Sequence, residues 1–365
     1  MSGMTARRSA DFKPDYAIPP GQTLADLLEE VGMSQTELSR RLGVSLKHVN
    51  QVVNGAASIS PDLALGLEKV FGVSAAFWVN RESMFRAEIA KRREHETLSK
   101  AVQWAKHFPV VELKKRGYLL PHLEGADLVS SLLEFFGIAS PRQWEAPEVA
   151  YRKSVKFESD PYALSAWLRV GELEAGEFDC KPYNGDSFIS ALQFARGLTS
   201  KDPSTWHPEL VGACAEAGVA LVIVDTFTGA RANGASRWLT PAKALIQLSL
   251  RHRWEDIFWF TFFHEAGHIL MHRKKDLFVD SPGDRRDASA DHLVSEHEAD
   301  RFASRTLIPQ SYDSELRELA LPKVRPFADR LGIAPAIVVG RLQHEGILQH
   351  HEGNMLRRRF VVKSK

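Results

Sequence analysis

One apolar segment, residues 257–271, contains two histidines four positions apart, His264 and His268, and Glu265 directly follows the first. The segment has no proline, and its only glycine lies inside the motif, so the pattern predicts a buried helix. Helix side chains at i and i+4 lie one turn apart on the same face, which lets both imidazoles bind one tetrahedral Zn²⁺. The sequence therefore predicts a zinc site, with Glu265 as the general base acting on water; a core helix with two hydrogen-bonded histidines is the alternative.

A zinc site of this type needs a third protein ligand, and a second helical pattern downstream offers candidates. Glu296 and Asp300 lie one turn apart on this predicted helix, which Pro309 ends. We expect Glu296 to bind the zinc and Asp300 to accept the free ring N–H of a histidine ligand. Glu298 is two residues from Glu296 and should face elsewhere. A solvent-exposed acidic helix face is the alternative interpretation.

The motif at 264–268, followed by Glu296-x-x-Ala-Asp300-x-Phe-Ala and Leu307-Ile308-Pro309, resembles the ImmA/IrrE family of metallopeptidases. The family carries Asn where this chain has Asp300, which brings the chain closer to the ExxxD pattern of other gluzincins. The resemblance covers roughly residues 219–348. It implies a zincin-like (gluzincin) domain with a small sheet, and a zinc metalloendopeptidase that cleaves a specific repressor or partner protein. Spacing alone implies only metal-assisted hydrolysis.

Three stretches around the motif predict local structure. Residues 219–225 predict a strand, and residues 241–250 alternate apolar and polar side chains as a second strand would. We expect this second strand to lie at the sheet edge, where a substrate backbone is laid along it; an ordinary sheet strand is the alternative. The polar stretch 231–238 is typical of a hairpin loop, with a border of the substrate cleft as the alternative. Residues 273–291 are typical of a mobile surface loop, with a lid as the alternative.

Short helical patterns broken by glycines occupy the N-terminal part of the chain. Ser34 with Glu37 gives a capping-box pattern, Gly43 suits a tight turn, and Ser45 suits the cap of the next helix. This spacing is typical of a helix-turn-helix unit. Residues 23–80 resemble Xre-type DNA-binding domains, and HigA-type antitoxins in particular.

In such a domain the helix that opens at Ser45 enters the DNA major groove, and polar side chains near its start contact bases and phosphates. We expect Leu46, Val49, Val52 and Val53 to face the domain core. The net charge of the chain is only +1, so DNA affinity should depend on a homodimer, and a protein-interaction module is the alternative. The expected DNA-contacting residues are Ser45, Lys47, His48, Asn50 and Gln51.

The 365 residues, 44% hydrophobic and 25% charged, are enough for two or three domains with substantial cores. Two cysteines at no metal-ligand spacing favour the cytoplasm, and no apolar run is long enough for a membrane span. We expect a mainly helical α+β fold. The expected parts are a flexible arm (1–20), a helix-turn-helix DNA-binding domain (21–93), a helical middle region (94–215), a metallopeptidase domain (216–350) and a basic tail (351–365).

Together, the two motif regions predict a DNA-binding transcriptional regulator that carries a zinc-dependent metallopeptidase. Its expected partners are an operator in double-stranded DNA and a protein substrate, toxin or repressor. The alternative is a HigA-like antitoxin or transcriptional repressor whose peptidase fold serves binding or metal sensing without turnover.

Overall fold

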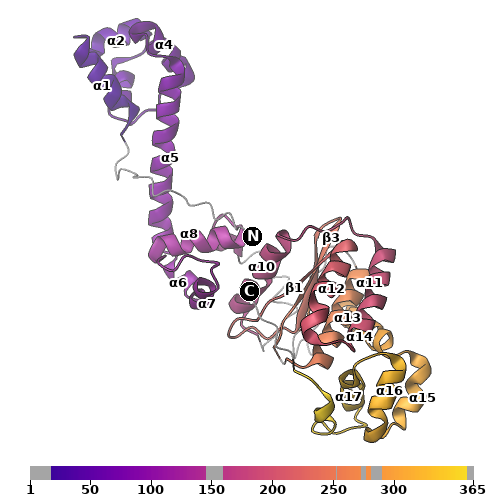
Figure 1. The fold of residues 1–365 in the computed structure, drawn as a ribbon. Coiled ribbons are helices and arrows are strands. Elements are labelled where there is room, and N and C mark those ends of the chain that lie inside the picture. The colour runs from indigo at the N-terminus through magenta and orange to yellow at the C-terminus, as the bar shows by residue number, and fades with distance from the viewer. Residues whose placement is uncertain (1–17, 145–158, 252, 273–276, 281–289, 360–365) are drawn as a thin grey trace. The chain divides into compact units, whose positions relative to one another are not determined.

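The structure is a computed structural model that describes residues 18–144, 159–251, 253–272, 277–280 and 290–359 (Figure 1). Nearly all of the predicted N-terminal arm, and most of the surface loop predicted at 273–291, lie outside these residues. The chain divides into two compact units, residues 1–102 with 125–127 and residues 103–124 with 128–365. Helices dominate both, and one small sheet lies in the second, which confirms the predicted fold class. Among the described helices, none combines the length and apolar character that crossing a membrane requires.

The first unit is a bundle of short helices followed by one long helix. The predicted caps are present: the Ser34 hydroxyl accepts a hydrogen bond from the Glu37 backbone N–H, and the Ser45 hydroxyl accepts one from that of His48. Gly43 ends the second helix with φ 68°, a conformation that favours glycine. The helices are α1 (Pro20–Glu30), α2 (Gln35–Leu42), α3 (Leu46–Val53), α4 (Pro61–Phe71) and α5 (Ala75–Ser99).

The core of the first unit brings α1 and α3 into close contact. A Cβ atom on Gly21 would lie 2.1 Å from the Val52 carbonyl oxygen, so only glycine allows this approach. Val49 and Val52 are buried as predicted, whereas Leu46 is 47% exposed, so its predicted place in the core is wrong. Leu46 opens the helix, and helix side chains point toward the N-terminus, so its side chain extends beyond the core.

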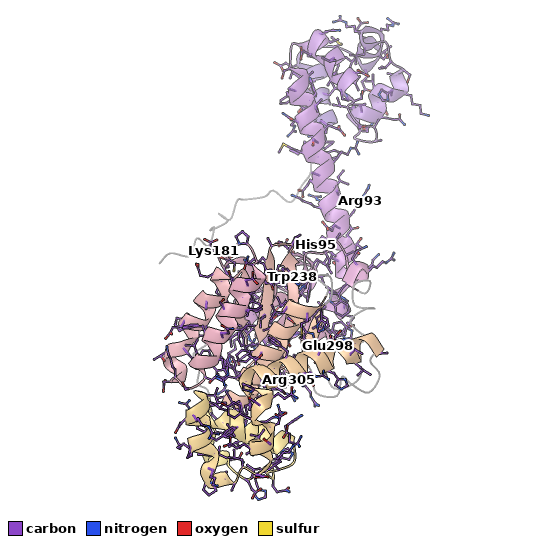
Figure 2. The ribbon with its side chains drawn as sticks, turned by 90° about the vertical axis from the view of Figure 1, so that its right-hand side faces the viewer. Arg93, His95, Lys181, Trp238, Glu298 and Arg305 are labelled. Atoms are coloured by element: carbon purple, nitrogen blue, oxygen red, sulfur yellow. The ribbon has the colours of Figure 1, made fainter. Side chains whose placement is uncertain are left out.

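Helix α5 continues past the bundle, and Arg93 and His95 lie in its C-terminal half (Figure 2). Further helices follow α5 along the chain, before the first strand of the sheet. They are α6 (Val102–Ala105), α7 (Val110–Lys115), α8 (Gly125–Phe136), α10 (Pro161–Gly176), α11 (Gly185–Leu198) and α12 (Pro203–Glu216).

The sheet has the strand order β1-β3-β2-β4, formed by β1 (Val219–Ile223), β2 (Gly234–Thr240), β3 (Lys243–Leu248) and β4 (Phe278–Asp280). Strand β3 pairs in parallel with β1, and β2 is antiparallel to both β3 and β4. The prediction that residues 241–250 form an edge strand is therefore wrong. The hairpin loop predicted at 231–238 is also wrong from Gly234 onward, because this polar, small-residue stretch forms β2.

Helices cover both faces of the sheet at the inner strand β3. On one face, Gln247 donates a hydrogen bond to the Trp167 carbonyl of α10 at 2.7 Å, and the Trp167 indole donates one to Val224 at 2.9 Å. On the other face, α12 packs against β1, and α13 (Glu255–Met271) packs against β2 and β3. Buried aromatic side chains fill this layer: Trp206, Trp259, Phe262 and Phe263. The helix that carries the histidines is thus fixed to the sheet along its length.

Helix α14 (Ala290–Leu307) packs closely against α13. A Cβ atom on Gly267, within the histidine motif, would lie 3.3 Å from the Ala299 Cα, which is tighter than ordinary contact. This small residue lets the backbones approach, so that ligands from two helices reach one point. The chain continues with α15 (Asp313–Arg317), α16 (Val324–Leu331), α17 (Pro335–His344) and 3₁₀ turns η2 (Gln310–Tyr312), η3 (Leu321–Lys323) and η4 (Asn354–Leu356).

Candidate metal centre

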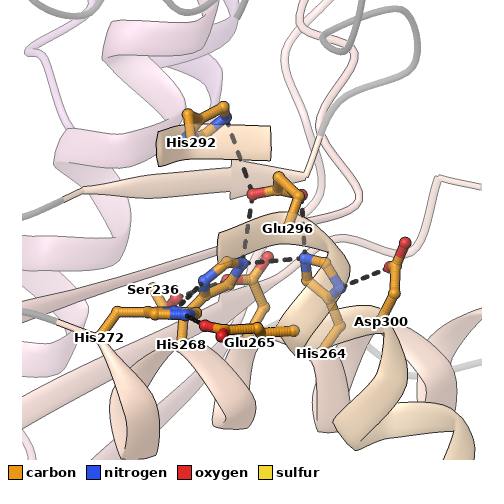
Figure 3. Close-up of polar contacts among 9 residues, drawn as sticks. Ser236, His264, Glu265, His268, His272, His292, Glu296 and Asp300 are labelled. Carbon is orange, nitrogen blue, oxygen red and sulfur yellow. Dashed lines mark hydrogen bonds and ion pairs between the residues drawn. The ribbon is translucent and has the colours of Figure 1, made fainter. Parts of the chain in front are cut away.

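Three side chains from α13 and α14 converge at one buried point (Figure 3). The Nε2 atoms of His264 and His268 lie 3.0 Å apart, and the Glu296 carboxylate oxygens lie 3.4 Å and 3.3 Å from them. Ligand atoms bound to zinc at about 2.0–2.1 Å form a tetrahedron with edges of roughly 3.3 Å. The three donors therefore already have the spacing of three corners of a zinc coordination sphere.

The buried polar atoms at this point lack the partners that a metal would supply. Oε1 of Glu296 accepts no hydrogen bond from the described residues, although it is buried. The Nδ1 atom of His264 lies 3.0 Å from Asp300 Oδ1, so in the neutral imidazole that binds a metal the proton is on Nδ1 and the Nε2 lone pair faces His268. The nitrogen lone pairs of His264 and His268 and the Glu296 carboxylate face one another, and a cation between them would bind all three. The residues predicted as ligands are thus brought together, and Asp300 lies where the sequence pattern placed it.

A second chain of contacts supports His268, and the sequence patterns did not predict it. His268 Nδ1 lies 2.9 Å from His272 Nδ1, and His272 Nε2 lies 3.1 Å from Glu298 Oε2. The signal was present in the sequence, because His272 follows His268 by one helical turn. Glu298 is not among the three converging ligands, as expected, and contacts His272 instead.

Glu265 is completely buried beside the ligands. The Ser236 hydroxyl on β2 donates a hydrogen bond of 2.6 Å to its Oε2, and its Oε1 has no hydrogen-bond partner among the described residues. Burial raises the pKa of Glu265 to about 8, while His264 and Ser236 act in the opposite direction. A Cβ atom on Gly234 would lie 2.8 Å from Oε1, so a glycine at this point of β2 leaves room for the carboxylate.

The two histidines experience different electrostatic surroundings. Burial lowers the pKa of His268 to about 4, so the neutral imidazole is favoured there. Burial also disfavours the charged form of His264, but hydrogen bonds to Asp300 and Glu296 raise its pKa well above the usual value. Burial would raise the pKa of Glu296, yet both histidines lower it far below its ordinary range. Glu296 is therefore ionised, as a metal ligand must be.

The predicted DNA-contacting residues lie on α3 with differing exposure. Lys47 and Gln51 are exposed, and His48 is half-buried. The exposed Ser45 caps the helix, and Asn50 contacts Gln35 at 3.4 Å and Asn54 at 3.0 Å. One face of α3 thus presents polar groups while Val49 and Val52 anchor the other. The DNA contacts themselves stay a prediction.

The fold and the site define a two-part protein, in which a helix-turn-helix unit is joined to a domain of the zincin type. Family models match both parts: residues 24–78 match the helix-turn-helix family, and residues 231–343 match the IrrE N-terminal-like domain. The chain therefore belongs to the proteins that join these two domains, which confirms the resemblance stated from the sequence.

Known proteins match about a fifth of the chain. Virulence-associated protein I of Dichelobacter nodosus is 32% identical over 77 residues, which span 21% of this chain and 71% of that protein. The uncharacterized HTH-type transcriptional regulator YddM of Escherichia coli is 25% identical over 73 residues, or 20% and 78% of the two chains. Among solved structures, the Pseudomonas aeruginosa antitoxin HigA with the higBA promoter is 34% identical, with 22% of this chain and 90% of that chain covered and a TM-score of 0.22.

Proposed function

We propose that this chain is a DNA-binding transcriptional regulator with a zinc-dependent endopeptidase domain that cleaves a specific repressor or partner protein. We assign DNA binding to residues 21–93 and hydrolysis to residues 216–350. One observation carries the proposal: two imidazole nitrogens and a carboxylate lie at zinc-ligand spacing, directly beside the buried carboxylate of Glu265.

The residues around the site suit peptide hydrolysis. A zinc ion supplies Lewis-acid chemistry when bound, through polarisation of a peptide carbonyl and activation of water. Glu265 would take a proton on Oε1, the oxygen without a hydrogen-bond partner, while Ser236 holds Oε2 in place. It would then pass that proton to the leaving amine. Asp300 would hold His264 in orientation through the ring Nδ1.

Replacement of the base separates hydrolysis from metal binding. Glu265→Gln should retain zinc and lose cleavage by about 10²–10⁴-fold, because the amide keeps the shape but cannot accept the proton. Cleavage is measured by mass spectrometry on a mixture of bacterial peptides, and zinc by elemental analysis. The matched control is Glu318→Gln on the exposed surface, which should cleave like the unchanged protein. Equal cleavage by Glu265→Gln would remove hydrolysis from the proposal.

The DNA-binding half is tested on α3. Asn50→Ala combined with Gln51→Ala should weaken binding to the promoter of the protein's own gene, because each amide that reads a base contributes about 1–3 kcal/mol. Gln22→Ala on the exposed surface of α1 is the matched control. Unchanged affinity in the double variant would mean that α3 does not contact the bases.

One observation favours a second function, a regulator that binds metal without turnover. His264 and His268 are each 2% exposed, Glu296 is 7% exposed and Glu265 is not exposed. Burial this complete limits the access of a protein substrate to the three ligands. In this case zinc would stabilise the domain, no peptide would be cleaved, and Glu265→Gln would leave gene regulation unchanged.

A further inference from the structure

A cavity of about 300 Å³ lies one helical turn from the metal centre. Phe260 lines it on α13, one turn before His264, and Ser304 lines it on α14, one turn after Asp300. The cavity volume is at the lower end of the range for ligand pockets. Its apolar walls come from Ile257, Leu307, Ile308 and Ile337. The cavity therefore adjoins the helical turns that precede His264 and follow Asp300.

Donors and acceptors both line the cavity, and among the acceptors are Asn233 and Asp280 at one end. Asn233 donates its side-chain amide to Asp280 Oδ2 at 3.1 Å, and its backbone N–H to the Asp280 carbonyl at 2.8 Å. These two hydrogen bonds hold Asn233, directly before β2, against Asp280 at the end of β4. The Asn233 Oδ1 atom is buried and has no hydrogen-bond partner among the described residues. A buried acceptor without a donor is unfavourable unless a ligand supplies one.

Asp280 differs from the other charged residues that line the cavity. Asp256 is paired with Arg357 at 2.8 Å, and Arg341 is paired with Glu345 at 2.6 Å. For Asp280, no arginine or lysine partner is present among the described residues. Glu296 and Asp300 add negative charge around it, and His264 acts in the opposite direction. Asp280 is therefore the carboxylate of this cavity that could pair with a cation from a ligand.

We propose that this cavity binds a basic side chain, lysine or arginine, of the peptide substrate beside the cleaved bond. The methylene groups would lie along the apolar walls, and the cationic tip would donate hydrogen bonds to Asp280 and to Asn233 Oδ1. Charge-assisted bonds of this kind are stronger than neutral ones. The inference rests on the proposed peptidase function, and it adds the residue class that the site selects.

Binding of zinc-directed ligands tests the inference without turnover. Three dipeptide hydroxamates are compared that differ only in the side chain next to the hydroxamate: lysine, norleucine or glutamate. Their dissociation constants are measured by calorimetry with the zinc-loaded full chain. The lysine compound should bind about tenfold more tightly than the norleucine compound, which has the same length without the charge.

Two variants assign the preference to a residue. Asp280→Asn should reduce the lysine-to-norleucine ratio to about one, because the anionic acceptor is gone. The matched control Asp329→Asn, an exposed residue on α16, should keep the ratio. Circular dichroism checks that Asp280→Asn folds. If this variant does not fold, the order of the three dissociation constants for the unchanged protein decides whether the cavity selects a basic side chain.

The outcomes separate this inference from the function on which it rests. Equal binding of all three compounds, tightest binding of the glutamate compound, or a lysine preference that survives Asp280→Asn would overturn the basic-side-chain assignment alone. A chain that retains no zinc and binds none of the compounds would overturn the peptidase proposal, and this inference with it.

Discussion

His264 and His268 have the same position relative to the metal centre but different supports behind them. Asp300 accepts a hydrogen bond from His264 Nδ1, whereas His268 Nδ1 faces His272, which in turn contacts Glu298. A carboxylate directly behind a histidine ligand increases its basicity and fixes its tautomer. Loss of Asp300 behind His264 should therefore change zinc affinity differently from loss of His272 behind His268.

Asp300 should govern zinc affinity in a graded way. Asp300→Ala removes the acceptor and should weaken zinc binding by about 10–100-fold. Asp300→Asn keeps a carbonyl oxygen that can accept the same hydrogen bond, so its loss should be smaller. The dissociation constants come from competition with a chelator, and Asp329→Ala on the exposed surface is the control. Equal affinity in all four proteins would show that Asp300 does not act through His264.

Gly234 should be sensitive to any added side chain. A Cβ atom there would lie 2.5 Å from Thr261 Cγ2 and 2.8 Å from Glu265 Oε1, so Gly234→Ala should destabilise the fold by about 1–3 kcal/mol. Gly212→Ala is the matched control, because nothing lies within 4 Å of its Cβ position on α12. It should be neutral or slightly stabilising. Urea denaturation gives both values, and equal values would contradict the packing of β2 on α13.

The sequence predicted the candidate site residues on the two helices, from spacing within each helix and from the family-like motif. His264, Glu265 and His268 share one helix, and the i+4 spacing alone places the two histidines on one face. Ser236, Asn233 and Asp280 escaped prediction, because they reach the site only through the pairing of β2 with β4 and the packing of β2 on α13. Such contacts depend on residues distant in sequence, and no periodic pattern encodes them.

At the scale of elements, the start of α13 is held by the end of the described chain. Arg357 makes two hydrogen bonds to Asp256, at 2.9 Å and 2.8 Å, and Arg358 contacts Glu255 at 3.0 Å. Both acids lie in the first turn of the helix, where negative charge is favourable. These ion pairs fix the N-terminal end of α13, the helix that carries the histidines.

The pair Arg357–Asp256 should matter far more than a surface pair. Its side chains are 10% and 8% exposed, and Arg357→Ala would leave a buried carboxylate unpaired, at a cost of about 3–5 kcal/mol. The comparison is Arg330→Ala, whose pair with Glu315 is 53% and 45% exposed and should contribute about 0–1 kcal/mol. Chemical denaturation measures both. Similar losses in the two variants would contradict the burial of the first pair.

The strand predictions show a second limit of sequence patterns. The alternation in residues 241–250 correctly predicted a strand, β3, but its place in the sheet depends on which strands pair with it. Both of its faces are covered, by α10 and by α13, so Gln247 is buried despite its polar side chain. Periodicity therefore identified the element and not its neighbours.

At the scale of the whole molecule, metal and DNA should act on different units. The three candidate ligands lie in the second unit, so zinc at one hundred times its dissociation constant should stabilise that unit by about 2.7 kcal/mol. Calorimetry of the full chain should show the transition of the second unit shifting downward after chelation, with that of the first unchanged. His264→Ala should abolish the shift. A shift of both transitions together would mean that the units unfold as one.

The most direct test of the central claim is X-ray absorption spectroscopy at the zinc edge of the loaded full chain. The convergence of His264, His268 and Glu296 predicts a first shell of two imidazole nitrogens with oxygen ligands at about 2.0–2.2 Å. His268→Ala should remove one imidazole from the spectrum. A first shell with sulfur at about 2.3 Å, or one without imidazole, would contradict a zinc centre built from these three side chains.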